Sequence, residues 1–97
     1  MLLIFNNVPI GCARLIFIGQ TIRLERMAII KTKRNQGFGK KLVWEIIRIA
    51  KNEKIKEIRI SAQIQAISFY QKIGFMLKGN TFEDAGIIHI KMVLLIK

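Results

Sequence analysis

One short basic stretch, residues 33–41 (KRNQGFGKK), combines two glycines with a run of positive charge. Ahead of a helix, such a stretch is suited to binding phosphate, because the first helical turn leaves backbone N–H groups unpaired and carries partial positive charge. Glycine also lets the backbone approach an anion closely. The amides of residues 36–40 would be the donors. The alternatives are that the stretch binds nucleic acid or that it is an ordinary basic turn before a helix.

Two well-known phosphate motifs do not fit this stretch. A P-loop needs a glycine where Arg34 stands and a serine or threonine where Lys41 stands. A dinucleotide fingerprint G-x-G-x-x-G finds Gly37 and Gly39, but Leu42 occupies the place of the third glycine. The two glycines alone are therefore weak evidence, and their meaning depends on the elements around them.

Hydrophobic periodicity predicts those elements. A helix is expected over residues 37–52, where apolar side chains recur every three or four positions, and a second over 64–73, closed by Gly74. Strands are expected over residues 10–17, 21–30, 54–61, 75–78 and 87–96, with a polar turn at 79–86. The order β-β-α-β-α-β-β predicts a mixed α/β (α+β) layer with one right-handed β-α-β crossover.

Composition limits the class of protein. The 97 residues, of which 52% are hydrophobic, predict a single domain over residues 1–97. No apolar run approaches the roughly 18 residues of a membrane span, and the start does not resemble a signal peptide. The single cysteine, Cys12, excludes an internal disulfide and a cysteine-based zinc site, fits a reducing cytoplasm and is expected to be buried. No metal site is expected.

The net charge of +11 is the strongest signal in the composition. It suggests polyanionic partners such as nucleic acid, anionic lipid or a phosphorylated cofactor. The lysines, however, are scattered through every segment, as they would be in any protein encoded by an AT-rich genome. With aromatic residues at 8% and no lysine- or arginine-rich arm, the sequence disfavours a nucleic-acid-binding protein.

Three stretches form a set in a particular order and spacing. Residues 34–39 (RNQGFG) match [QR]-x-x-G-x-[GA], residues 63–75 (QIQAISFYQKIGF) are similar to N-x-x-A-x-x-F-Y-x-x-x-G-F, and residues 83–92 (EDAGIIHIKM) are similar to E-[DE]-A-G-I-P-H-x-x-M. Gln63 replaces the usual asparagine and Ile88 the usual proline. Over about residues 9–93, the chain resembles the GNAT superfamily of N-acetyltransferases, in particular its small ElaA-like bacterial branch.

The resemblance implies a mostly antiparallel sheet and a binding site for acetyl-CoA. That substrate would lie in a V-shaped opening between the strands that end at Ile30 and Ser61. The backbone of Met27 and Ile29 would pair with the pantetheine arm. The amides of the glycine loop would hold the pyrophosphate through Arg34, Asn35, Gln36, Gly37, Phe38, Gly39 and Lys40.

The same resemblance suggests catalytic roles. Tyr70, the only tyrosine, occupies the position of the family's usual general acid, although packing beside Phe69 and Phe75 is an alternative. Glu25 is the candidate base, acting through a water molecule, and an ion pair with Arg23, with Arg26 or with a neighbouring strand is the alternative.

His89, the only histidine, is a second candidate base. As a strand residue, its ring could instead be satisfied by a carbonyl of the adjacent turn.

Family members normally begin with a strand and one or two helices that wall the acceptor site, whereas this chain begins at the family's second strand. An uncovered sheet edge is therefore expected, and with it a homodimer. The predicted function is a cytoplasmic, acetyl-CoA-dependent N-acetyltransferase acting on a primary amine of a small molecule or peptide. A shortened coenzyme A-binding relative without turnover and a small basic nucleic-acid-binding protein are the alternatives.

Overall fold

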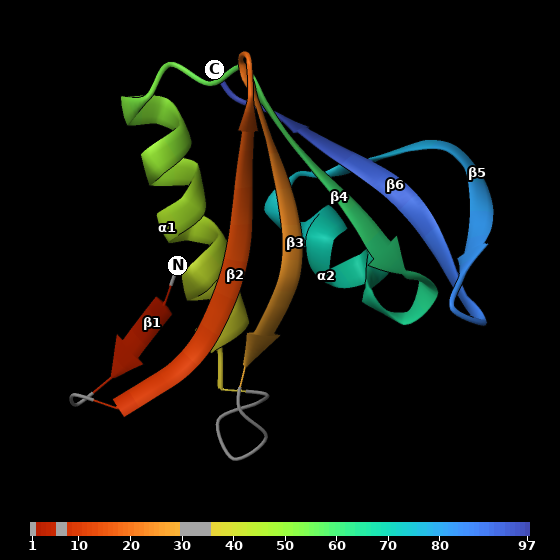
Figure 1. Cartoon of the computed structure of the whole chain (residues 1–97), viewed down its shortest axis with the longest axis horizontal. Coiled ribbons are helices and arrows are strands. Elements are labelled where there is room, and N and C mark those ends of the chain that lie inside the picture. The colour runs from red at the N-terminus through yellow and green to blue at the C-terminus, as the bar shows by residue number, and fades with distance from the viewer. Residues whose placement is uncertain (1, 6–7, 30–35) are drawn as a thin grey trace.

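The computed structural model describes residues 2–5, 8–29 and 36–97, which form one six-stranded sheet with two helices (Figure 1). The strands lie in the order β1-β2-β3-β4-β6-β5, and only β3 and β4 run parallel. The elements are β1 Leu2–Phe5, β2 Val8–Ile18, β3 Thr21–Ile29, α1 Phe38–Asn52, β4 Glu57–Gln63, a 3₁₀ helix Ile64–Ala66, α2 Ile67–Ile73, β5 Met76–Asp84 and β6 Ile87–Leu95. The predicted α+β fold and its β-α-β crossover are confirmed.

Both helices pack on one face of the sheet and share one core. The apolar stripe of α1 is buried there, through Phe38, Leu42, Val43, Ile46, Ile47 and Ala50. The apolar side of α2 packs against the same cluster, through Ile67, Phe69, Tyr70 and Ile73. Helix α1 begins after Gly37, which adopts the left-handed conformation (φ 82°), and α2 ends at Gly74 (φ 123°) as expected.

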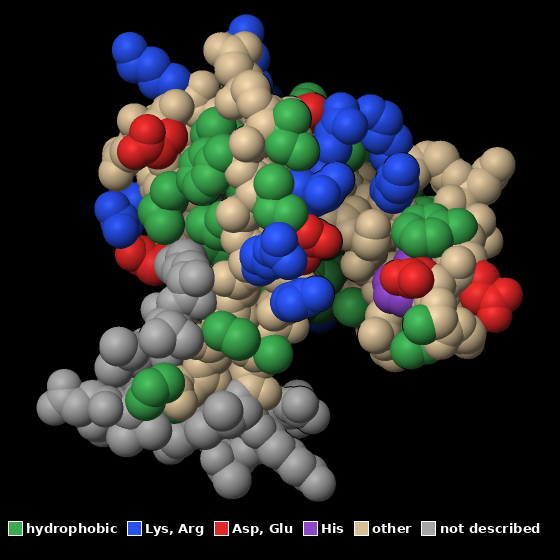
Figure 2. Space-filling view, in the orientation of Figure 1, with side chains coloured by type: hydrophobic (Ala, Val, Ile, Leu, Met, Phe, Trp, Pro, Cys, Tyr) green, Lys and Arg blue, Asp and Glu red, His purple; other side chains and the backbone are tan. Residues whose placement is uncertain are grey.

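The other face of the sheet carries no helix of the described part of the chain (Figure 1). Its side chains alternate with the core residues along each strand and are polar or basic at many positions, including Arg14, Arg23, Arg59, Lys78 and Lys91. Figure 2 shows Lys and Arg side chains gathered over the middle and upper right of the molecule in this view. We call this surface the open face.

Strand β5 is longer than predicted. We expected a strand over residues 75–78 followed by a polar turn over 79–86, but β5 continues to Asp84 and the turn is only Ala85 and Gly86. The register of β5 against β6 shifts between Lys78 and Phe82, so the polar residues in between form an irregular part of a strand.

The start of the chain and its cysteine also differ from expectation. Residues 2–5 form β1, which pairs antiparallel with β2, so β1 covers the edge on which the homodimer prediction rested. The outer strands of the sheet are β1 and β5. Cys12, expected in the interior, is exposed, because the alternation of β2 buries its neighbours Gly11 and Ala13 and turns Cys12 to the open face.

Helices long and apolar enough to cross a membrane are absent from the part of the chain that the structure describes. The longer of the two α-helices, α1, has 15 residues and is amphipathic.

Candidate functional site

The candidate site is an opening between β3 and β4. Parallel pairing of the two strands ends at Leu24 and Ile60. Beyond that point β3 stays paired with β2 as far as Ile29, whereas β4 stays paired with β6 as far as Gln63. The strands therefore diverge and leave a cavity of about 600 Å³. Its walls are residues 23–27, residues 60–63, Ala66, Tyr70, Asp84 and His89.

A β-bulge on β3 lies at the point of divergence. Cys12 pairs with Ala28 and Arg14 with Glu25, so one residue of β2 faces two residues of β3, Arg26 and Met27. Arg26 has a positive φ of 52°, a strained conformation for a residue with a side chain. Bulges bend a strand and re-aim its side chains, and they often lie beside active sites.

The bulge shifts which residues of β3 face the core. Ile22 and Leu24 are buried on the helix side, and after the bulge Met27 and Ile29 pack against the same core. Successive core-facing residues of β3 are thus two, three and two positions apart, whereas a regular strand would place them two apart throughout. The sequence analysis did not predict this bulge, although the interrupted alternation in TIRLERMAI was the signal that could have revealed it.

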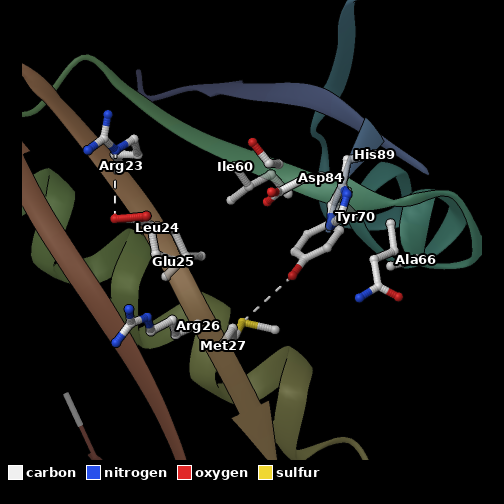
Figure 3. A pocket seen from close by; sticks show the side chains of 13 residues that line it. Arg23, Leu24, Glu25, Arg26, Met27, Ile60, Ala66, Tyr70, Asp84 and His89 are labelled. Carbon is white, nitrogen blue, oxygen red and sulfur yellow. Dashed lines mark hydrogen bonds and ion pairs between the residues drawn. The ribbon is translucent and has the colours of Figure 1, made fainter. Parts of the chain in front are cut away.

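Tyr70 reaches the opening from α2. Its hydroxyl lies 3.9 Å from the Sδ atom of Met27 on β3 (Figure 3). This contact links the two walls of the opening. The ring makes edge contacts with Phe69 and Phe75, with centroids 5.0 and 5.4 Å away. Burial in this setting raises the pKa of the Tyr70 phenol above its ordinary value, because the charged phenolate is poorly solvated there. The phenol therefore keeps its proton at neutral pH.

Glu25 lies on the opposite wall from Tyr70 and on the open face. Its Oε1 atom is 3.8 Å from the Nε atom of Arg23, two residues earlier on the same side of β3 (Figure 3). The ion pair that the sequence analysis gave as the alternative for Glu25 is therefore present. Both groups line the cavity, so the pair does not remove Glu25 from the site.

His89 also lines the cavity, but its ring is engaged locally. The Nδ1 atom is 2.9 Å from the carbonyl oxygen of Ile87, and the ring stacks on Phe82 with a centroid distance of 5.8 Å. The expected bond to a carbonyl near the turn is therefore present. Asp84 lies beside His89 and Tyr70 in the same wall (Figure 3).

The first turn of α1 lies close to the end of β3 and to α2. A Cβ atom placed on Gly39 would lie 3.4 Å from the ring of Phe69 and 3.9 Å from the side chain of Ile29. The first turn of α1 therefore lies against both the end of β3 and α2. Among the predicted loop residues, Arg34 and Asn35 lie outside the described residues, as does Ile30 of the predicted strand end.

The first turn of α1 has the features of an anion site. The helical bonding starts with Lys41 N–H donating to the Gly37 carbonyl at 3.1 Å, so the amides of Gly39 and Lys40 precede the first helical hydrogen bond. This turn contains no acidic residue, and Lys40 is exposed beside it. Phe38 belongs to the predicted loop residues, but its side chain is buried. It therefore contributes packing and not a side-chain contact with an anion. Gln36 and Gly37 are exposed ahead of it.

Groups of three or more His, Cys, Asp or Glu side chains that could hold a metal ion are absent among the described residues. The residues that line the opening include a tyrosine, a histidine, a glutamate, an aspartate and two arginines.

Residues 1–96 match the family model of the acetyltransferase (GNAT) domain. The chain belongs to the GNAT family. The sequence-based recognition is thereby confirmed, and it rests on nearly the full length of the chain.

Individual relatives agree with this assignment. A candidate acetyltransferase of Bacillus subtilis (strain 168), BSU40680, is 39% identical over 87 residues, which is 90% of this chain and 59% of that protein. The chain thus spans about three fifths of the length of this relative.

Two solved structures share the fold. Escherichia coli ElaA has a TM-score of 0.84 at 22% identity, over 95% of this chain and 64% of that one. A GNAT family acetyltransferase from Elizabethkingia anophelis, solved with acetyl-CoA bound, has a TM-score of 0.76 at 28% identity, over 97% of this chain and 71% of that one.

Proposed function

We propose that the protein is an acetyl-CoA-dependent N-acetyltransferase that moves an acetyl group to a primary amine of a small molecule or peptide. The observation that carries the proposal is the opening between β3 and β4 with Tyr70 in its wall, together with the first turn of α1, which lies against Ile29 at the end of β3. The acetyl-CoA bound to the Elizabethkingia relative supports the choice of acetyl donor. Because this donor is a metabolite of the cell interior, the proposal places the protein, as one unit over residues 1–97, in the cytoplasm.

The residues of the chain would hold the donor in three places. The amides of residues 36–40, together with Arg34 and Asn35, would bind the pyrophosphate, where the helix terminus favours negative charge. The backbone of Met27 and Ile29, beyond the point of divergence, would pair with the pantetheine arm as an added strand does. The donor supplies the acetyl thioester, and a site of this kind accelerates its reaction by proximity and by fixed dipoles around the reacting carbonyl.

Tyr70 would act as the general acid in this proposal. As the amine displaces the thiol, the sulfur leaves with the electron pair of its bond to the acetyl carbon and takes the proton of the Tyr70 hydroxyl. The raised pKa of Tyr70 keeps that proton available at neutral pH. Glu25 would take the proton lost by the attacking amine, directly or through water.

Binding of the donor is tested by thermal melting with and without acetyl-CoA. We expect a rise in Tm that is lost in Gly37→Asp and in Gly39→Asp, because a carboxylate there repels the pyrophosphate. Gly79→Asp is the matched control for Gly37→Asp, since both glycines have a positive φ (81° and 82°) and open space around an added Cβ. A Gly79→Asp variant that loses the shift, or a wild-type protein without one at millimolar ligand, contradicts the proposal.

Turnover is tested separately by acetyl transfer to a panel of amines. Tyr70→Phe should lower kcat by about 100-fold or more, the usual effect of a general acid, while the acetyl-CoA-dependent rise in Tm stays. A Tm shift without any turnover would identify the alternative, a coenzyme A-binding GNAT protein that does not catalyse transfer. Unchanged kcat in Tyr70→Phe would remove Tyr70 from the mechanism.

We also propose a homodimer, on a different basis from the one predicted. Both outer strands of the sheet, β1 and β5, present an edge, and β5 carries exposed apolar side chains at Met76 and Leu77. Light scattering at micromolar concentration should give twice the 11.2 kDa mass of the chain, and a monomer mass would refute the proposal.

A further inference from the structure

The two ring nitrogens of His89 have different surroundings. The Nδ1 atom lies 2.9 Å from the carbonyl oxygen of Ile87. Because a carbonyl oxygen only accepts hydrogen bonds, Nδ1 must carry the proton of this contact. In the neutral imidazole the other nitrogen, Nε2, then holds the lone pair. The bond to the backbone therefore leaves His89 with a nitrogen that can accept a proton.

The fold holds this ring in one orientation. It stacks on the ring of Phe82 in the neighbouring strand β5, with centroids 5.8 Å apart and 22° between the two planes. The stacking sets the plane of the His89 ring, and the bond to Ile87 sets its rotation within that plane. Nε2 has no hydrogen-bond partner among the residues that the structure describes. A base that is oriented before its substrate arrives needs no further ordering to act.

The His89 ring lines the opening in the same wall as the phenol of Tyr70 and the carboxylate of Asp84 (Figure 3). Since Tyr70 is the proposed proton donor to the leaving thiol, the proposed reaction takes place at this wall. By the register of β5 against β6, Asp84 and His89 project from the same side of the hairpin. A carboxylate attracts an ammonium ion and stabilises an imidazolium ion. The wall thus combines a proton donor, a proton acceptor and a negative charge.

We infer that His89 accepts the proton that the incoming ammonium group must lose before it can attack the thioester. The N–H bond breaks and leaves its electron pair on the amine, while the proton forms a bond to Nε2. The imidazolium beside Asp84 later releases this proton to water. Glu25, on the other wall, takes the second proton, which the amine nitrogen loses as it bonds to the acetyl carbon. This inference rests on the proposed acetyltransferase activity and adds a catalytic residue to it.

Two small amines of similar size separate this role from a structural one. Ethylamine is an ammonium ion at neutral pH, whereas trifluoroethylamine is mostly neutral because its fluorine atoms withdraw electrons. His89→Asn removes the base but keeps an amide N–H that can donate to the Ile87 carbonyl. We expect kcat/KM for ethylamine to fall about 100-fold, the lower end for a general base, and that for trifluoroethylamine to fall much less. Damage to the fold or to acetyl-CoA binding would lower both values alike.

Two neighbouring carboxylates at the end of β5 provide a matched pair of variants. Asp84→Asn removes a carboxylate that lines the opening, whereas Glu83→Gln removes one from a residue that does not line it. Asp84→Asn should lower kcat/KM for ethylamine more than that for trifluoroethylamine. Glu83→Gln should leave both values as in the wild type. The same loss in both variants would contradict the role given to Asp84.

The tautomer is tested without turnover. His89 is the only histidine of the chain, so NMR of the neutral ring in the untagged protein gives one pair of histidine nitrogen signals. We expect the proton on Nδ1, and a proton on Nε2 overturns the inference even where acetyl transfer is measured. Equal losses for the two amines in His89→Asn overturn it as well. If no amine of the panel is acetylated, the proposed function itself fails, and the role of His89 fails with it.

Discussion

At the scale of single residues, Tyr70 is the side chain in which structure and chemistry depend most on each other. It packs against Phe69 and Phe75 and also places its hydroxyl at the cavity, so the packing and the acid role proposed for it are compatible. Burial raises its pKa because the charged phenolate is less stable in the folded state than in the unfolded chain.

The shifted pKa of Tyr70 makes stability depend on pH in the alkaline range. The folded state binds the phenolic proton more tightly than the unfolded chain, whose tyrosine titrates near the ordinary value of 10.0. The contribution of Tyr70 is therefore fully present below about pH 10 and is lost as the pH rises through the higher pKa of the folded state.

Urea unfolding at about pH 8 and about pH 11 measures this effect, since both values lie clear of the ordinary tyrosine pKa. We expect the free energy of unfolding to fall more between the two pH values in the wild type than in Tyr70→Phe. Lysines titrate in both proteins alike, so only the difference between them reports on Tyr70. Equal losses would contradict the assignment.

At the scale of elements, the start of α1 and the bulge of β3 do most to shape the site. Gly37 ends the glycine loop in the left-handed region at φ 82°, with no atom within 4 Å of an added Cβ. Strain rather than crowding therefore decides what this position tolerates.

Gly37→Ala should lower the free energy of unfolding by about 1 kcal/mol, the usual cost of a left-handed conformation for a residue with a Cβ. Gly37→Asn should cost less, because asparagine tolerates that region better than alanine. Urea denaturation of the two variants measures the difference. Equal stability of Gly37→Ala and the wild type would mean that the helix can start without the left-handed residue.

Deletion of Arg26 should give a folded protein that no longer binds acetyl-CoA. Without this residue the apolar positions Ile22, Leu24, Met27 and Ile29 would alternate regularly, so the core face of β3 is kept while the bulge is lost. The strand could then stay beside β4 and close the opening. Circular dichroism and the acetyl-CoA-dependent Tm shift measure the two properties.

Arg26→Gln is the control, since it changes the side chain but keeps the length of the strand, and it should retain the Tm shift. If the deletion variant keeps the shift as well, the bulge is not what separates β3 from β4.

The same elements show what a sequence can and cannot predict. The apolar spacing of α1 and the alternation of β4 were sufficient to predict these two elements, because each of them buries one face against a single core. Strand β5 was predicted to be too short, since Gly79 and Asn80 are typical turn residues. The strand continues because Lys78 and Phe82, on either side of the irregular part, both pair with β6. For the site, a motif position predicted Tyr70, and Glu25 was chosen because it lies on the strand before the glycine loop. The place of Asp84 depends on how far β5 extends.

At the scale of the whole molecule, the main feature is the large surplus of positive charge. Seventeen basic residues face six acidic ones, and several of the basic residues lie together on the open face. Such a surplus of one sign destabilises the compact state through self-repulsion.

Raising sodium chloride from about 10 mM to about 100 mM shortens the Debye length from about 30 Å to about 10 Å. Tm should then rise, by about 4–8 °C for each kcal/mol of repulsion that is screened in a domain of this size. Potassium chloride should act equally, because screening depends on ionic strength alone. An unchanged or lower Tm would show that the ion pairs on the sheet, such as that of Arg59 with Glu57, outweigh the repulsion.

The exposure of β5 has a consequence for how the proposed activity would be lost on warming. Eight of its nine residues are exposed, and its ladder contact is with β6 alone. Its backbone amides should therefore exchange with deuterium through local fraying, well before those of β3 and β4. Because Asp84 ends this strand and lines the opening, fraying would remove part of one wall of the opening while the first turn of α1 stays intact. Heat should then abolish acetyl transfer at a temperature at which the bulk of the molecule is still folded and still binds acetyl-CoA.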